Sequence, residues 1–171
     1  MVGTLINLSG KKIKKMITEK DVLNIQKTWG DALIKIGSLK DNRAVCEAEA
    51  EKVIDSLYAF NLGPVLFKPT RAAEDQFRGT KEGALSYFIG GNSNFPEDEG
   101  FALQPWSNVR FENTGIILNE NSALAMGNYF FTEKGTGAIK KVEYSFGYVK
   151  DNSGNLKINL HHSSVPFTPS M

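Results

Sequence analysis

The two histidines of this 171-residue sequence are neighbours, His161 and His162, and two serines follow them directly. Side chains on a β-strand alternate between faces, so His161 and Ser163 share one face, while His162 shares the other with Ile158 and Leu160. A histidine beside a serine on one polar face is suited to proton transfer in a cavity. The alternative is a strand end at which the histidine only hydrogen-bonds a neighbouring backbone. In either case the two imidazoles point apart and cannot hold one ion together.

Motifs for several other chemistries are missing. The sequence has no GxxxxGK phosphate loop, no GxSxG nucleophile turn and no HExxH zinc motif. The single cysteine, Cys46, excludes an intramolecular disulfide and is predicted to pack as a small apolar side chain. A catalytic zinc normally takes three protein ligands. Because the histidines lie on opposite faces of one strand, we expect neither a metal nor another cofactor.

The charges nearly cancel, with 20 Lys and Arg residues against 19 Asp and Glu residues. Binding of nucleic acid needs a strongly basic face, so no nucleic-acid partner is expected. No apolar run reaches the roughly 18 to 20 residues of a membrane helix, and the lysines at 11–15 follow the first apolar stretch, unlike those of a secretory signal. We therefore expect a cytoplasmic protein without a membrane partner, with a tail at 1–15 and a single domain at 16–171.

The first part of the chain has the pattern of helices. Thr18 and Asp21 have the spacing of a capping box, apolar residues recur at helical spacing over 22–36, and Gly37 is a stop signal. Further helices are predicted over 41–58 and 81–89, with a short strand over 65–67 between them. Residues 92–105 are predicted to form a long surface loop, a kind of segment that is often functional.

The last third has the pattern of a sheet. Four runs of strand length, 108–118, 123–132, 138–150 and 156–165, are separated by short segments rich in Asn, Asp and Gly. Short connections between long strands predict antiparallel neighbours. The sequence thus predicts an α+β fold, in which a curved antiparallel sheet wraps around the N-terminal helices and encloses a pocket.

Motifs spread along residues 16–167 resemble those of the iota-class carbonic anhydrases. They are Phe67-Lys-Pro-Thr70, Gln76-Phe-Arg78, Ala84-Leu-Ser-Tyr87-Phe, Phe95-Pro-Glu-Asp, Gly100-Phe-Ala, Pro105-Trp, Val109-Arg-Phe-Glu-Asn113, Ala125-Met-Gly-Asn-Tyr-Phe-Phe-Thr132, Val142-Glu-Tyr-Ser-Phe-Gly-Tyr148 and the closing His161-His-Ser-Ser164. That family is related to the association domain of calcium/calmodulin-dependent kinase II. The resemblance implies the same nuclear-transport-factor-2-like cone fold.

The resemblance also implies reversible hydration of carbon dioxide to bicarbonate, in a pocket between the concave sheet and the helices. Thr70, Tyr87 and Ser163 match the pocket hydroxyls of the family, and strand alternation adds His161 to that pocket. A neutral His161 with an ordinary pKa near 6.5 would accept the proton of the attacking water. Carbon dioxide also needs an apolar wall beside these donors. The candidates for that wall are Phe88, Phe101 and Trp106.

Two other functions stay open. One is a non-catalytic association module of the same fold. The other is a small-molecule isomerase or cyclase that uses Glu112 or Glu143 as its base. We also expect a homodimer or a higher closed oligomer, because the aromatic residues that alternate along the runs 129–131 and 144–148 exceed the evident need of one core face.

Overall fold

The computed structural model describes residues 16–169, so the tail predicted at 1–15 lies outside the described residues. Three α-helices, one 3₁₀ helix and five strands follow one another. They are α1 (Glu19–Ser38), α2 (Arg43–Leu57), β1 (Leu66–Lys68), α3 (Lys81–Ile89), η1 (Phe101–Leu103), β2 (Trp106–Leu118), β3 (Ser122–Glu133), β4 (Ile139–Lys150) and β5 (Leu156–Ser164).

Side-chain caps start all three α-helices. Thr18 and Asp21 form the predicted capping box of α1, and Asn42 and Thr80 accept hydrogen bonds from backbone N–H groups in the first turns of α2 and α3. Such caps satisfy backbone donors that have no partner within the helix. No helix in the described part of the chain is both long enough and apolar enough to cross a membrane.

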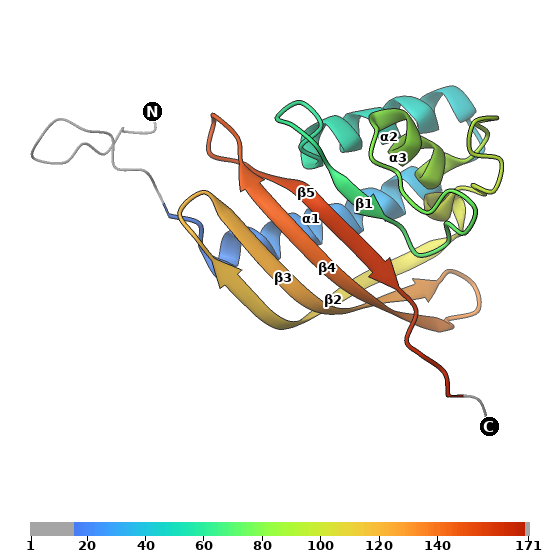
Figure 1. Cartoon of the computed structure of the whole chain (residues 1–171). Helices are drawn as coiled ribbons and strands as arrows, with labels where there is room; N and C mark the ends of the chain where they lie inside the picture. The colour runs from blue at the N-terminus through green and yellow to red at the C-terminus, as the bar shows by residue number, and fades with distance from the viewer. Residues whose placement is uncertain (1–15, 170–171) are drawn as a thin grey trace, which may run out of the picture.

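The five strands form one sheet in the order β1-β5-β4-β3-β2. Strands β2 to β5 are the predicted antiparallel meander, and β1 joins its edge parallel to β5 with Phe67 opposite His161. Figure 1 shows the curved sheet with α1 along its inner face, while α2 and α3 lie toward its β1 edge. The α+β fold predicted from the sequence is confirmed, and the loop predicted at 92–105 contains the short helix η1 near its end.

The inner face of the sheet is lined with aromatic rings. Trp29 of α1 lies among them, and its ring centroid is 5.8 Å from that of Tyr129 and 5.4 Å from that of His161. The strand aromatics that suggested an exposed association surface are buried here instead, namely Tyr129, Phe131, Tyr144, Phe146 and Tyr148. That basis for the oligomer prediction is therefore wrong, because these rings fill the core between the curved sheet and the helices.

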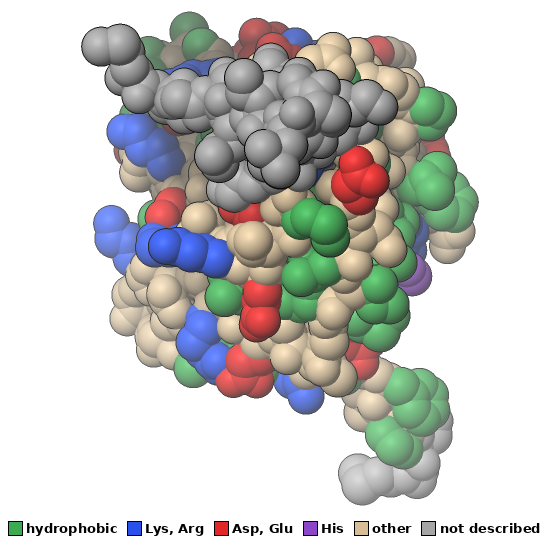
Figure 2. All heavy atoms as spheres, turned by 90° about the vertical axis from the view of Figure 1, so that its left-hand side faces the viewer, with side chains coloured by type: hydrophobic (Ala, Val, Ile, Leu, Met, Phe, Trp, Pro, Cys, Tyr) green, Lys and Arg blue, Asp and Glu red, His purple; other side chains and the backbone are tan. Residues whose placement is uncertain are grey.

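The outer face of the sheet carries a different apolar set. The side chains of Ile117, Leu124 and Met126 are 60%, 47% and 61% exposed. A groove of about 320 Å³ beside Met126 is also lined by Glu143 and His162. Figure 2 shows exposed hydrophobic side chains gathered along one side of the molecule. Exposed apolar surface of this kind is typical of sites of association.

Candidate active site

His161 lies at the centre of the inner face of β5 and is 2% exposed. The register places Phe67 of β1 on one side of it and Phe146 of β4 on the other. Both rings stack on the imidazole, with centroid distances of 4.7 Å and 4.2 Å. Two neighbouring strands therefore fix the plane of the His161 ring.

Both ring nitrogens of His161 have hydroxyl partners. Nε2 lies 3.2 Å from Ser163 Oγ and 3.3 Å from the Tyr129 hydroxyl, and these two hydroxyls are themselves hydrogen-bonded. Nδ1 lies 2.9 Å from the Tyr58 hydroxyl, which accepts a hydrogen bond of 3.0 Å from Trp29 Nε1. Alternation along β5 thus puts His161 and Ser163 on one buried face, as predicted from the sequence.

The other two predicted hydroxyls come from different elements. Thr70 follows β1, and Tyr87 lies in the last turn of α3. The Thr70 side chain and the Arg71 backbone lie close enough to the Tyr87 hydroxyl to oppose the rise that burial causes in its pKa. The Tyr129 hydroxyl also interacts with the Thr70 side chain. Tyr129 therefore connects the pair formed by Thr70 and Tyr87 with the pair formed by His161 and Ser163.

A cavity of about 350 Å³ opens beside Thr70. Phe101, Trp106 and Phe131 give it an apolar wall, and Arg71 also lines it. A second hollow of about 210 Å³ lies beside Tyr87, and Arg71 and Phe101 border both spaces. The predicted wall residues Phe101 and Trp106 thus line the cavity at Thr70.

The third predicted wall residue, Phe88, lies elsewhere. It is 2% exposed and lines neither space, and its ring packs against those of Trp29, Tyr58 and Phe67. Phe88 therefore supports the network behind the hydroxyls.

Burial keeps this network uncharged. Desolvation lowers the pKa of His161 to about 3, and the neighbouring His162 adds to the effect. Desolvation also raises the pKa values of Tyr58, Tyr87 and Tyr129 above their ordinary range. The pKa near 6.5 expected for His161 is therefore wrong, because a buried imidazole loses the hydration that would stabilise its charge.

The arrangement offers neutral hydroxyl donors beside a small apolar space. Within residues 16–169 no group of three or more His, Cys, Asp or Glu side chains is arranged to hold a metal ion. The family model of the metal-independent carbonic anhydrases matches residues 20–165, which is most of the chain. The chain belongs to this family.

Individual relatives agree with the assignment. The metal-independent carbonic anhydrase of Nostoc sp. (strain PCC 7120) is 45% identical over 158 residues, covering 91% of this chain and 77% of the relative. The crystal structure of a cyanobacterial iota-carbonic anhydrase in complex with bicarbonate is 44% identical, with a TM-score of 0.89 over 93% of this chain and 98% of that chain.

A more distant structure supports the fold alone. A nuclear-transport-factor-2-like protein with a cystatin-like fold from Novosphingobium aromaticivorans is 7% identical and has a TM-score of 0.56. It covers 85% of this chain and 80% of that chain.

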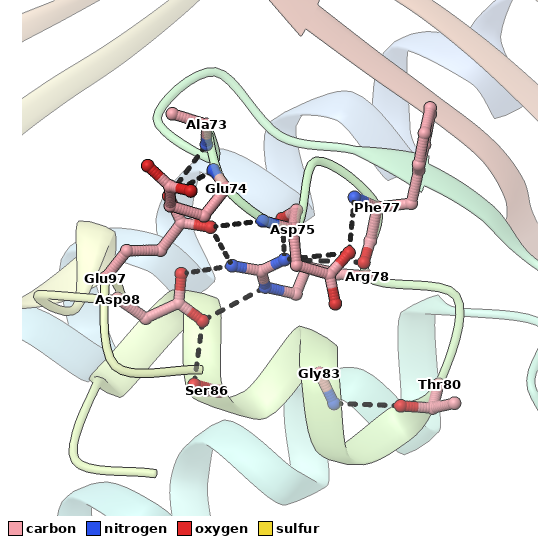
Figure 3. Close-up of polar contacts among 10 residues, drawn as sticks. All are labelled: Ala73, Glu74, Asp75, Phe77, Arg78, Thr80, Gly83, Ser86, Glu97 and Asp98. Atoms are coloured by element: carbon pink, nitrogen blue, oxygen red, sulfur yellow. Dashed lines mark hydrogen bonds and ion pairs between the residues drawn. The ribbon is translucent and has the colours of Figure 1, made fainter. Parts of the chain in front are cut away.

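In this carbonic anhydrase, a buried ion pair ties the segment after Thr70 to α3, which carries Tyr87. Arg78 is 0% exposed, and its Nε and Nη2 donate to the two carboxylate oxygens of Asp98 over 3.0 Å and 2.8 Å. The Ser86 hydroxyl of α3 donates to Asp98 over 2.7 Å. Arg78 also reaches Glu97 over 3.3 Å. Figure 3 shows the guanidinium facing both carboxylates.

Glu97 fixes the backbone that follows Thr70. Its carboxylate accepts hydrogen bonds from the N–H groups of Ala73, Glu74 and Asp75, over 2.7 to 3.0 Å. These backbone donors, with the Arg78 guanidinium, lower the pKa of Glu97 to about 2. Gly90 allows the end of α3 to lie close to Asp98, because its φ is +62° and a Cβ would lie 2.9 Å from the Asp98 carbonyl oxygen.

Two details of the strand alternation differ from the prediction. The register of β4 and β5 shifts where Asn159 is an extra residue, so Ile158 is buried on the same side as His161 rather than with His162. His162 is exposed on the outer face.

The two glutamates considered for an isomerase lie outside the cavity. Glu112 is exposed and paired with Arg110, and Glu143 is exposed and accepts a hydrogen bond from Ser164. Neither position favours the isomerase or cyclase alternative.

Sequence reasoning missed Tyr129, Tyr58 and Trp29 as parts of the site. Tyr129 was considered only as one member of an alternating aromatic run. Tyr58 and Trp29 are far from His161 in the sequence, since the Tyr58 contact spans 103 residues. The one available signal was the alternation of β3, which puts Tyr129 on the same face as Phe131.

Proposed function

We propose that reversible hydration of carbon dioxide to bicarbonate takes place in the cavity beside Thr70. The observation that carries this proposal is the meeting of the Thr70, Tyr129 and Ser163 hydroxyls behind an opening walled by Phe101 and Trp106. Apolar carbon dioxide suits the aromatic wall, and bicarbonate needs the donors. The bicarbonate complex of the cyanobacterial relative supports the same substrate for this chain.

In this proposal the oxygen of a bound water attacks the carbon of carbon dioxide, and the water loses a proton to solvent at the open side of the cavity. Negative charge develops on the oxygens of the nascent bicarbonate. The hydroxyls of Thr70 and Tyr87 stabilise that charge by donating hydrogen bonds. Ser163 acts on them through Tyr129, which links the hydroxyls into one network. Because these groups are already oriented in a buried setting, they need little reorganisation during the reaction.

His161 has a supporting task in this mechanism. A group with a pKa of about 3 is a weak base at neutral pH. We therefore assign His161 to the orientation of Ser163 and Tyr129, through its Nε2 contacts of 3.2 Å and 3.3 Å. The family is described as metal-independent, and no step of this mechanism passes through a metal.

Stopped-flow measurement of carbon dioxide hydration by the purified chain tests the proposal. We expect activity in the unmodified protein and a loss of about 100- to 1,000-fold in kcat for Ser163→Ala, the size of the effect of removing one donor from an oxyanion site. Ser164→Ala is the matched control, because its hydroxyl contacts Glu143 on the other face. Absence of activity in a folded, unmodified chain would support the association module instead.

We also propose that one cytoplasmic domain, residues 16–171, carries the activity. Every contact of the site joins residues between Trp29 and Ser163, which supports a single domain. The lone buried thiol, Cys46, is compatible with a reducing compartment.

Two copies of the chain are further proposed to associate through the outer sheet face, where Leu124 and Met126 are exposed. Light scattering tests this: Met126→Glu should convert the dimer into a monomer, and a monomeric unmodified chain at micromolar concentration would refute it.

A further inference from the structure

The hydrogen-bonded network extends behind His161, away from the cavity. It continues through the Tyr58 hydroxyl to Trp29 Nε1, and both of these side chains are buried. We propose that Tyr58 and Trp29 are positioning residues that hold His161 with its hydrogen on Nε2, which leaves the Tyr129–Ser163 pair a hydroxyl hydrogen to donate toward Thr70. The inference rests on the proposed function, because that donation serves the bicarbonate oxygens.

Trp29 sets the donor-to-acceptor direction of these hydrogen bonds. An indole Nε1–H can only donate, so the Tyr58 oxygen accepts this bond of 3.0 Å. The hydrogen of the Tyr58 hydroxyl then needs an acceptor, and His161 Nδ1, at 2.9 Å, is the other partner of this hydroxyl. Buried polar groups almost always have a partner, and leaving one without it is costly. Nδ1 is therefore the acceptor and carries no hydrogen.

The protonation of Nε2 follows because the ring is neutral. Burial holds the pKa of His161 at about 3, so at neutral pH the ring carries one hydrogen, and that hydrogen lies on Nε2. It is directed at Ser163 Oγ and the Tyr129 hydroxyl, at 3.2 Å and 3.3 Å. His161 thus donates toward the substrate side.

The tautomer of His161 determines how many hydroxyl hydrogens Tyr129 and Ser163 have left for the substrate side. Tyr129 and Ser163 have one hydroxyl hydrogen each, and their mutual hydrogen bond uses one of the two. With Nε2–H donating to the pair, neither hydroxyl has to donate back to the ring. The second hydrogen is then available for Thr70, which lies near the Tyr129 hydroxyl and lines the cavity.

The opposite tautomer would reverse this arrangement. Nδ1–H would then donate to Tyr58. The Tyr58 oxygen would receive two donors, and its own hydrogen would lack an acceptor among the described residues. Nε2 would become an acceptor and take up the second hydroxyl hydrogen of the Tyr129–Ser163 pair. The pair would then present only lone pairs toward Thr70, which cannot stabilise a bicarbonate oxygen. One buried phenol therefore decides whether the site donates or accepts.

Nuclear magnetic resonance of the ¹⁵N-histidine-labelled full chain reads the tautomer directly. The chain has two histidines, so a His162→Gln variant identifies the signals of His161. We expect the Nε2–H pattern for His161 in the unmodified protein and a substantial Nδ1–H population in Tyr58→Phe, which keeps the ring but removes the hydroxyl. An Nδ1–H pattern in the unmodified protein would overturn the inference.

Kinetics of the same variants connect the tautomer to the reaction. We expect kcat of Tyr58→Phe to fall about 10- to 100-fold, by analogy with the loss seen when a partner that orients a metal-bound histidine is removed. Tyr144→Phe is the matched control, because it removes another buried phenol, hydrogen-bonded to Asn113 rather than to His161. It should leave both tautomer and kcat unchanged. Circular dichroism checks that each variant is folded.

Three other results would refute parts of the inference or of the proposed function. If Tyr58→Phe keeps the pure Nε2–H pattern, Tyr58 does not position the ring, whatever happens to kcat. If the tautomer changes and kcat does not, the link to donation toward the substrate is wrong. If the unmodified protein has no hydration activity, the proposed function fails, while the nuclear magnetic resonance result still decides which nitrogen carries the hydrogen.

Discussion

Acidification should destabilise this protein through His161 well before most carboxylates titrate. The pKa of the ring is about 3 in the folded chain, against an ordinary value of about 6.5 in the unfolded chain. Below pH 6.5 the unfolded state therefore binds a proton that the folded state does not bind. Stability that is fully present above pH 6.5 is lost as the pH falls toward 3, at about 1.4 kcal/mol per pH unit. At pH 5 the loss amounts to about 2 kcal/mol.

Urea unfolding at pH 7 and pH 5 measures this loss. The control is His161→Gln, which has no imidazole to protonate but keeps the carboxylates of the chain. We expect the free energy of unfolding of the unmodified protein to fall by about 2 kcal/mol more than that of the variant between the two pH values. Glu97, whose pKa is lowered to about 2, loses its contribution only as the pH falls from about 4.3 toward 2, so it does not interfere at pH 5. Equal losses in the two proteins would refute the account of a buried, neutral imidazole.

Three further predictions concern the ion pair, the outer face and metals. Asp98→Asn should lower the free energy of unfolding by about 3 kcal/mol in urea titrations, because it removes the bidentate partner of a fully buried Arg78, whereas Asp75→Asn at the exposed Asp75 should cost under about 1 kcal/mol. A cost below about 1 kcal/mol for both variants would contradict this. His162→Ala should change stability by at most about 0.5 kcal/mol and leave hydration activity intact, since the side chain is exposed on the outer face. Exhaustive chelation should leave hydration activity unchanged in stopped-flow assays, and activity restored only by added zinc would contradict that expectation.

Local chemistry explains which parts of the fold could be predicted. The capping box at Thr18 and the turns between the long strands act over a few residues, so the sequence reports them directly. The parallel pairing of β1 with β5 depends on residues that are distant in the sequence. A strand of three residues is too short for its pattern to predict which strand it pairs with. The bulge at Asn159 likewise arises where β5 meets β4. A local signal for it is Gly147 inside β4, where a Cβ would lie 2.8 Å from Leu160 Cβ.

Some features of the site could be predicted from local patterns, and others could not. Alternation was enough to put His161 and Ser163 on one face, and the family resemblance supplied Thr70 and Tyr87. The protonation behaviour of His161 could not be predicted, because it depends on complete burial between Phe67 and Phe146. The role of Tyr129 could not be predicted either, because it depends on β3 and β5 lying on either side of β4.

The position of β5 between β1 and β4 has a consequence for synthesis on the ribosome. Of the five strands of this sheet, β5 is synthesised last, and it completes both the sheet and the site, since it supplies His161 and Ser163. Until then β4 is an open edge, and the rings of Phe67 and Phe146 lack the imidazole that separates them. An open strand edge beside apolar rings is prone to pair with other chains. We therefore expect a chain truncated before residue 156 to aggregate rather than to fold as a weakened enzyme.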